Sequence, residues 1–321
     1  MKKALKITGK IILGLIVLLL LALLAIFIMH RYKLSQEKDL ISQPIGEMTE
    51  VDGKNMCVYT AGSGEHTIVF MSGYGTPSPI LDFKPLWNRL KENNRIAVVE
   101  KFGYGFSDET DDPRDIDTML RQTREALKAA GVEGPYILCP HSASGIEAIY
   151  WAQTYPEEVE AIAALDIAVP GYNEETGYSI FADRLMAFIV DSGLIRLMPT
   201  ESFEWGINSP DLTEAEREQY KALMYARRGS STMLHEAEWC KRNMETISQK
   251  DVPDVPMLFF ISKKMAAGIF PSDPDKYMQL FRNYTHNEKQ YIDVDCGHYI
   301  HVEEPDFTAA EIERFIEDTE N

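Results

Sequence analysis

The sequence predicts an α/β protein with a mostly parallel central sheet, helices on both faces, and one transmembrane helix at the N-terminus. Three observations support this. From residue 51 onward, short apolar runs alternate with amphipathic stretches, as a parallel sheet joined by helices requires. Residues 11–29 form an uncharged apolar segment. The chain has 321 residues, 45% of them hydrophobic, which is enough to build one sizeable core.

The apolar segment at residues 11–29 is long enough to approach a bilayer span. At ~1.5 Å per residue it nearly crosses a hydrocarbon core of ~30 Å. A cleaved signal peptide is the alternative, but its apolar region would be shorter and would end in small residues, whereas this one ends Ile26-Phe27-Ile28-Met29. We therefore predict an uncleaved single-pass anchor over residues 1–33 and a linker over 34–50. Four lysines precede the segment: Lys2, Lys3, Lys6 and Lys10. By the positive-inside rule they keep the N-terminus in the cytoplasm and place the main domain outside it.

Net charge argues against one class of partner. The whole chain carries −18, and residues 1–33 hold six Lys/Arg and no acids. The remaining 26 basic and 50 acidic residues give −24. Because phosphate binding needs clustered cations, we expect no nucleic-acid partner.

The cysteine spacing indicates neither a metal nor a redox site, because no C-x-x-C pattern occurs among Cys57, Cys139, Cys240 and Cys296. Nothing in the sequence implies a metal or an organic cofactor. Cys139 and Cys296 flank two motifs described below, so a disulfide between them and buried free thiols both stay open; we favour the thiols.

The alternation places six strands and two helices. Apolar runs typical of buried parallel strands occur at 67–71, 95–99, 136–139, 161–165, 257–261 and 290–294. Helical periodicity marks 116–130, and a second helix is expected at 146–155. Residues 170–251 interrupt the alternation with helical signals at 180–190, 213–225 and 232–248. The apolar residues of this insertion either line a pocket or hold it onto the core; they include Phe181, Met186, Phe188, Leu197, Met198, Phe203, Trp205, Met224 and Met233.

Ser142 lies in the most informative motif of the chain, residues 137–146. It stands between an apolar run and an expected helix, with Ala143, Ser144 and Gly145 after it. A nucleophilic serine needs a sharp strand-to-helix turn that exposes its Oγ beside a helix N-terminus, and such a turn needs small neighbours. The usual pattern is G-x-S-x-G; here Pro140 and Ser144 replace the glycines.

His298 is the only histidine with a motif that suits a catalytic base. It lies in a G-H-x-x-H-x-E-x-P segment that follows the last predicted strand. A serine near mid-chain and a late histidine match the order in hydrolases whose acid lies between them. We expect His301 to support the loop and His141 not to be the base. Three further histidines have no partner pattern and are expected at the surface: His66, His235 and His286.

With these motifs, residues 51–321 resemble the α/β-hydrolase superfamily, in its cap-bearing serine esterase-like branch. Residues 67–75 are similar to the third strand and oxyanion loop, with Ser72 where the family usually has His. Residues 95–108 are similar to the fourth strand and its loop, with Glu100 in place of Asp. The resemblance implies an α/β-hydrolase fold whose helical cap is inserted at about 170–251.

The resemblance leaves the third member of a catalytic triad open. In most members the acid follows the seventh strand, but residues 262–268 contain no carboxylate. Asp166, at the end of the sixth strand, is our preferred acid; Asp273 or Asp275, or no functional acid, are the alternatives. The backbone N–H groups of Tyr74 and Ala143 are the expected oxyanion donors.

These residues predict a serine hydrolase that cleaves the carboxylic ester of a small-molecule or lipid-like substrate through an acyl-enzyme. Ser142 would attack, His298 would shuttle the proton, and Asp166 would orient the imidazole. Amide or peptide hydrolysis and a non-catalytic binding module remain alternatives. Epoxide hydrolase or dehalogenase chemistry would need Asp at position 142.

Overall fold

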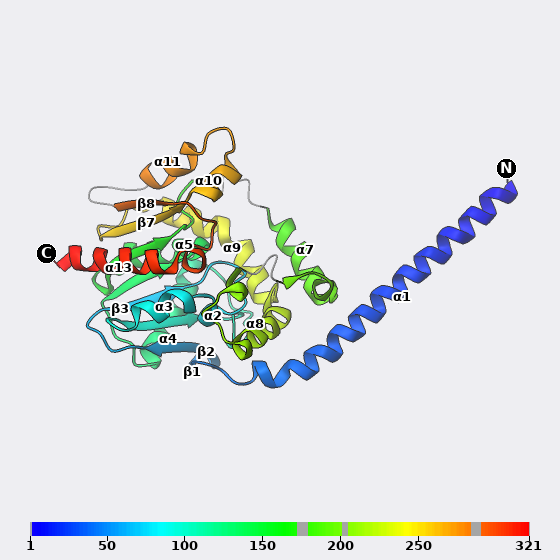
Figure 1. Cartoon of the computed structure of the whole chain (residues 1–321), viewed down its shortest axis with the longest axis horizontal. Helices are drawn as coiled ribbons and strands as arrows, with labels where there is room; N and C mark the ends of the chain where they lie inside the picture. The colour runs from blue at the N-terminus through cyan, green and yellow to red at the C-terminus, as the bar shows by residue number, and fades with distance from the viewer. Residues whose placement is uncertain (1, 172–178, 201–204, 284–289, 321) are drawn as a thin grey trace.

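The computed structural model describes residues 2–171, 179–200, 205–283 and 290–320, and its centre is one sheet (Figure 1). The eight strands lie in the order β1-β2-β4-β3-β5-β6-β7-β8. β1 and β2 pair antiparallel, and β3 to β8 are parallel. The strands are β1 Glu47–Val51, β2 Lys54–Ala61, β3 Thr67–Met71, β4 Arg95–Glu100, β5 Tyr136–Pro140, β6 Val159–Leu165, β7 Met257–Ser262 and β8 Gln290–Val294.

Side chains of the central strands are buried alternately on the two faces of the sheet. Val69, Val99 and Leu138 pack on one face with α4 (Ile116–Ala129) and α5 (Gly145–Thr154). Ile68, Val98 and Ile137 pack on the other. That face is covered by α2 (Pro79–Asp82), α3 (Lys84–Leu90) and α13 (Pro305–Glu320). Both faces of the central strands are therefore buried, which explains why the sequences of these strands are continuous apolar runs.

Between β6 and β7 the chain forms the helical insertion expected at 170–251. Its helices are α7 Ile180–Asp191, α8 Glu214–Arg227 and α9 Ser231–Ser248, with short 3₁₀ turns η3 Leu194–Leu197 and η5 Trp205–Asn208. The polar sequence ahead of α8 explains its start, because Thr213 and Glu216 form a reciprocal capping box. We call this segment the cap. After β7 come α10 Lys263–Ile269, α11 Asp275–Asn283 and α12 Ile300–Glu303.

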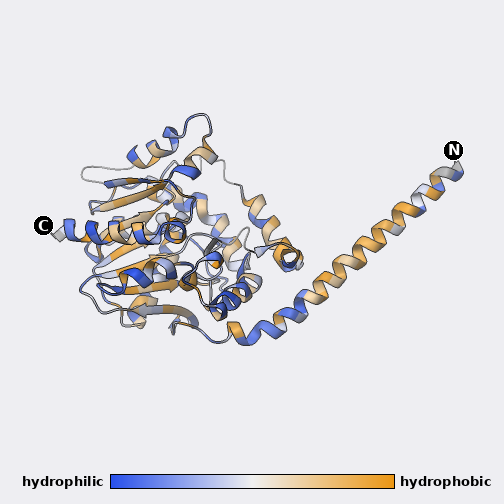
Figure 2. Cartoon of the chain, in the orientation of Figure 1, coloured by the Kyte–Doolittle hydropathy of each residue, from blue (hydrophilic) through white to orange (hydrophobic). Residues whose placement is uncertain are grey.

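The first helix, α1, runs without a break from Lys2 to Ile41. The expected linker at 34–50 is different in the structure: its first part continues α1, and its last part forms most of β1. The helix continues because its polar end packs against α8, where Gln219 donates hydrogen bonds to the carbonyls of Leu40 and Gln43. Among the described helices, α1 is the one long and apolar enough to cross a membrane (Figure 2).

Candidate active site

Ser142 sits in a strained turn directly after β5. Its φ is +55°, in the left-handed region that residues with a side chain rarely adopt. The strand ends at Pro140, a 3₁₀ turn covers Ser142–Ser144, and α5 follows. This is the strand–turn–helix geometry that a nucleophilic serine requires, and strain of this kind is concentrated at functional sites.

Ser144, one of the two residues that depart from G-x-S-x-G, has a clear structural role. The Ser144 hydroxyl lies 2.6 Å from the Met71 carbonyl and accepts the N–H of His141 at 3.0 Å, so it ties the turn to the end of β3. Gly145, one residue later, makes the close approach: a Cβ there would lie 2.5 Å from the side chain of Ile167. The small residue that the turn requires is thus Gly145, one position after Ser144, where the usual motif has its second glycine.

The loop after β3 packs directly on Ser142. A Cβ at Gly73 would lie only 2.8 Å from Cβ of Ser142, so the backbone at this point needs glycine. Tyr74 and Ala143 both line the cavity that Ser142 faces. Ala143 lies in the first turn of a helix, where N–H groups have no intrahelical acceptor. These positions suit the predicted oxyanion donors.

Asp166 and His298 are brought together by the fold. The Nδ1–H of His298 donates to Oδ2 of Asp166 at 2.6 Å. The other carboxylate oxygen accepts the N–H of Ser262 and the hydroxyl of Tyr277, each at 3.0 Å. Asp166 also has a positive φ, +46°, and its side chain is fully buried. The carboxylate is therefore held rigidly, and it leaves Nε2 as the basic nitrogen of the neutral ring.

Asp273 and Asp275 lie elsewhere. Both are exposed, at the start of α11. Ser262 is the last residue of β7, after which most members of the superfamily carry the acid. Its hydroxyl accepts the N–H of Met265 and so caps α10, and its own N–H donates to Asp166. Of the three candidates, Asp166 is the carboxylate in contact with His298.

His298 lies next to the turn that carries Ser142. Its ring centroid is 4.5 Å from that of His141, and the Nε2–H of His141 donates to the His298 carbonyl at 3.0 Å. Burial holds the pKa of His141 well below its ordinary value, so this ring stays neutral and acts as a support. Within the described part of the chain, no hydrogen bond joins Ser142 to His298. Such catalytic contacts often tighten only when substrate binds.

His301 supports the same loop from its buried side. Its Nε2 lies 2.9 Å from Oδ2 of Asp82, and both side chains are fully buried. Oδ1 of Asp82 accepts the hydroxyl of Tyr220, which comes from α8 of the cap. The carboxylate of Asp82, on α2, thus joins the loop of His298 to the cap.

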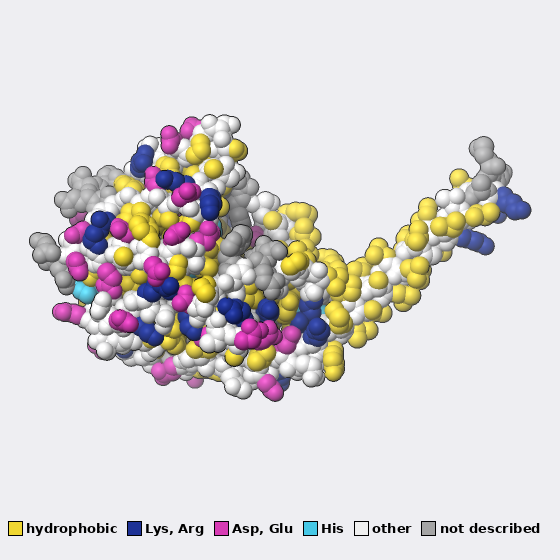
Figure 3. Space-filling model, viewed as in Figure 1, with side chains coloured by type: hydrophobic (Ala, Val, Ile, Leu, Met, Phe, Trp, Pro, Cys, Tyr) yellow, Lys and Arg dark blue, Asp and Glu magenta, His cyan; other side chains and the backbone are white. Residues whose placement is uncertain are grey.

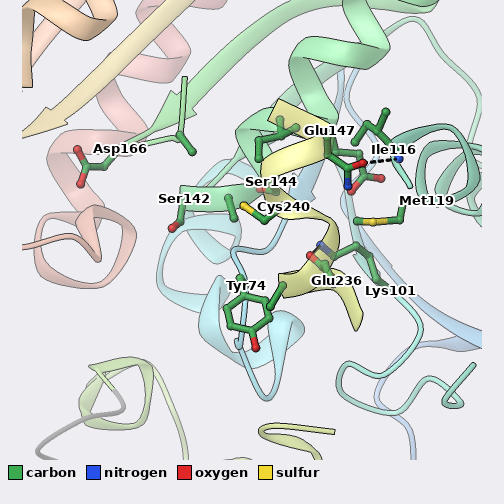
Figure 4. A pocket seen from close by; sticks show the side chains of 15 residues that line it. Tyr74, Lys101, Ile116, Met119, Ser142, Ser144, Glu147, Asp166, Glu236 and Cys240 are labelled. Carbon is green, nitrogen blue, oxygen red and sulfur yellow. Dashed lines mark hydrogen bonds and ion pairs between the residues drawn. The ribbon is translucent and has the colours of Figure 1, made fainter. Parts of the chain in front are cut away.

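The cavity beside Ser142 has a volume of about 210 Å³ and a polar end that sequence reasoning missed (Figure 4). There Lys101 and Glu236 form an almost buried ion pair at 2.6 Å. Glu147 is buried, accepts from Thr123 at 2.6 Å, and has its pKa raised by burial. In Figure 4, Ser142 lies between Asp166 on one side and this charged group on the other. One signal was available: Glu147 is a lone acid in the apolar run 145–152.

Of the apolar cap residues that were expected either to line a pocket or to hold the cap onto the core, none of the described ones lines this cavity. Met224 and Met233 are buried, whereas Phe181, Phe188, Leu197 and Met198 are exposed. Phe203 and the side chain of Trp205 lie outside what the structure describes. The lining comes from α9 instead, through Glu236, Ala237, Cys240 and Asn243, because α9 is the cap helix that packs on α5.

The cysteines are all free thiols in the structure. Cys57, Cys139 and Cys296 are buried, and Cys240 is half-buried in the cavity wall. Burial raises the pKa of Cys296 to about 12. The interpretation as buried free thiols therefore fits Cys139 and Cys296.

Comparison with known proteins finds similarity in sequence and in structure. The uncharacterized protein YbdG of Bacillus subtilis is 41% identical over 242 residues, 74% of each chain. No model of a known protein family matches. Among solved structures, epoxide hydrolase CorEH covers 85% of this chain and 98% of its own at TM-score 0.62 and 18% identity. The enol-lactonase of Burkholderia xenovorans covers 84% and 100% at TM-score 0.58 and 17% identity. Both likenesses show the α/β-hydrolase fold.

Proposed function

Because the chain belongs to the same family as Bacillus subtilis YbdG and has the α/β-hydrolase fold, we propose that it is a serine hydrolase that cleaves a carboxylic ester. One observation carries the proposal. The Asp166–His298 hydrogen bond lies next to a serine in a strained elbow, at the ends of neighbouring strands. The loop of Asp166 is also joined to the elbow, since Ala168 N–H donates to the Ser142 carbonyl at 2.9 Å.

The mechanism follows from the proton inventory of these groups. Ser142 Oγ attacks the ester carbonyl while Nε2 of His298 removes its proton, and Asp166 stabilises the imidazolium that forms. The N–H groups of Ala143 and Tyr74 stabilise the oxyanion. His298 then protonates the leaving alcohol, and a water that it activates hydrolyses the acyl-enzyme. Substrate binding must bring His298 within hydrogen-bond distance of Ser142.

The size of the cavity supports a short acyl group. Its volume of about 210 Å³ lies below the range of about 300–1,000 Å³ that is typical of pockets for drug-sized ligands. Its far end is closed by the charged pair Lys101–Glu236, which an alkyl chain would leave unsolvated. A short or polar acyl group fits this cavity, and the alcohol part of the substrate lies outside it.

A fluorophosphonate probe tests the proposal, because it phosphonylates an activated serine. We expect labelling of the full chain in membranes and its loss in Ser142→Ala. Ser72→Ala is the matched control: Ser72 is also buried near the cavity, and among the described residues its hydroxyl has no hydrogen-bond partner. Absence of labelling in a folded wild-type protein would favour the non-catalytic module. Labelling combined with cleavage of anilides rather than esters would favour the amide hydrolase.

For the location of the protein, we propose that α1 is an uncleaved single-pass anchor and that the domain faces away from the cytoplasm. The apolar segment 11–29 and the lysines that precede it support this orientation. The membrane would then be a permanent partner of the protein. The charge of −24 on residues 34–321 disfavours binding to nucleic acid.

A further inference from the structure

The exposed large apolar side chains of the domain gather on one edge of the cap. Outside α1, the described residues expose six such side chains, and five of them lie on α7 or in and just after η3: Phe181, Leu185, Phe188, Leu197 and Met198. We call these five residues the cap patch. The sixth, Phe307, lies on α13. Phe181, Leu185 and Phe188 follow i, i+4, i+7 spacing, so they share one face of α7.

The cap patch adjoins α1 through a set of specific contacts. Arg196 of η3 donates two hydrogen bonds to Glu37, at 2.8 and 2.6 Å, and its Nε lies 2.9 Å from Nδ1 of His30. The guanidinium also stacks on Tyr225 of α8 at 3.9 Å. At Gly193 the backbone approaches α1 so closely that a Cβ would lie 2.5 Å from His30. The cap is therefore fixed to α1 between residues 30 and 37.

These contacts lie at one particular level of α1. The uncharged segment ends at Met29, and His30, Arg31 and Lys33 follow it. If 11–29 occupies the hydrocarbon core, residue 30 stands at the interface with the headgroups. In Figure 1, α7 runs across the direction of α1, and η3, which follows α7 in the chain, contacts α1; Figure 3 shows apolar side chains on that side of the body.

We propose that the cap patch docks into the surface of the same bilayer that α1 spans, so that α7 lies in the interface as a monotopic helix. The inference rests on α1 being the anchor and is independent of the proposed reaction. An interfacial helix needs an apolar face at headgroup depth, and α7 presents one. The apolar side chains must supply the affinity, since a domain of net charge −24 gains no attraction from anionic lipids.

A second copy of the chain is the other occupant that an apolar face of this kind fits. The position of the patch favours the bilayer: it begins where the cap contacts α1 and continues at the level where the apolar segment ends. A membrane surface is then next to every side chain of the patch, whatever the concentration of protein.

Depth-dependent fluorescence quenching tests the docking. The full chain is placed in nanodiscs at one copy per disc, with a polarity-sensitive fluorophore on Phe188→Cys or Leu185→Cys in a Cys240→Ala background. The other three native cysteines are buried. Lipids with a nitroxide near the headgroup should quench both probes several-fold more than a probe at Phe307→Cys, whose site is also exposed but lies on α13.

Equal, weak quenching at all three sites would overturn the proposal. If the probe at Phe188→Cys is shielded from water only in vesicles with many copies of the chain, and not at one copy per disc, the patch would be assigned to self-association instead. Thermal melting of each variant checks folding, and nanodisc incorporation checks that α1 is inserted. Fluorophosphonate labelling reports the proposed enzyme separately, so failure of either idea can be recognised by itself.

Discussion

Asp166 is the residue on which the chemistry of the site depends most. It is buried, it accepts three hydrogen bonds, and one of them comes from His298. A carboxylate so placed fixes the tautomer of the imidazole and stabilises its protonated form. Tyr277, from α11, therefore acts on the proposed chemistry only through the position of this carboxylate.

Replacement of this acid by its amide should nearly abolish turnover. We expect Asp166→Asn to lower kcat by ~10⁴-fold, because the amide would favour the wrong imidazole tautomer. The measurement is steady-state hydrolysis of p-nitrophenyl butyrate. Asp273→Asn, at an exposed site, should leave kcat unchanged; a loss there combined with a near-normal Asp166→Asn would assign the acid to the other position.

Glu100 gives the fold a built-in pH dependence. It is fully buried, and burial raises its pKa from 4.5 to about 8, although it accepts the N–H of Phe106 at 2.7 Å. The native state then keeps this proton between pH 4.5 and 8 while the unfolded chain loses it. The free energy of unfolding must therefore fall as the pH rises through this window.

Glu100→Gln should remove that pH dependence, because the amide stays neutral. We expect the free energy of unfolding of the wild type to fall by on the order of a few kcal/mol between about pH 5 and 8, seen as a falling melting temperature, and the variant to show a flatter profile. Parallel slopes for the two proteins would mean that Glu100 is ionised in the native state. Glu92→Gln, at an exposed position outside the buried core, is the control substitution.

At the scale of elements, the cap is attached to the body by buried polar contacts rather than by apolar packing alone. Tyr220 of α8 reaches Asp82 at the end of α2, and the same carboxylate holds His301 of α12. Glu236 of α9 pairs with Lys101 after β4. Because these groups are desolvated, each depends on its partner.

Loss of the Tyr220 hydroxyl should loosen this attachment. Tyr220→Phe removes one hydrogen bond to Asp82 and should lower the free energy of unfolding by about 1–3 kcal/mol. Chemical denaturation in detergent measures it. Tyr32→Phe, at a 64% exposed position on α1, should change nothing. Unchanged stability of Tyr220→Phe would show that water replaces the hydroxyl.

At the scale of the whole molecule, α1 extends as one long helix from the acidic domain, and we propose that it tethers this domain to a membrane (Figure 1). We expect membranes washed with alkaline carbonate to retain the full-length chain. The substitutions Leu18→Arg and Leu20→Arg should reduce insertion of α1 into the membrane, since each arginine costs about 2.5–3.5 kcal/mol at the centre of a span. Release of a shortened soluble form from wild-type membranes would show that the apolar segment is a cleaved signal.

The outer strands show where sequence reasoning stopped. Five of the six parallel strands could be predicted because burial on both faces leaves them mostly apolar. β8 was predicted as well, although this edge strand is only partly buried. β1 and β2 were not predicted: they form an antiparallel edge, both include exposed positions, and their sequences mix polar with apolar residues, so neither gives a continuous apolar run. The continuation of α1 beyond residue 33 was missed because it depends on contact with α8.

The sequence alone determined the six parallel strands, the helices α4, α5 and α7–α9, and the two motifs around Ser142 and His298, because periodicity and turn chemistry are local properties of the chain. Only the tertiary structure decided between Asp166 and the acids near α11, since that choice depends on which carboxylate reaches an imidazole 132 residues away. It also assembled Lys101, Glu147 and Glu236 at one end of the cavity. Residues from separate elements become neighbours only through packing, and no local pattern records which ones will meet.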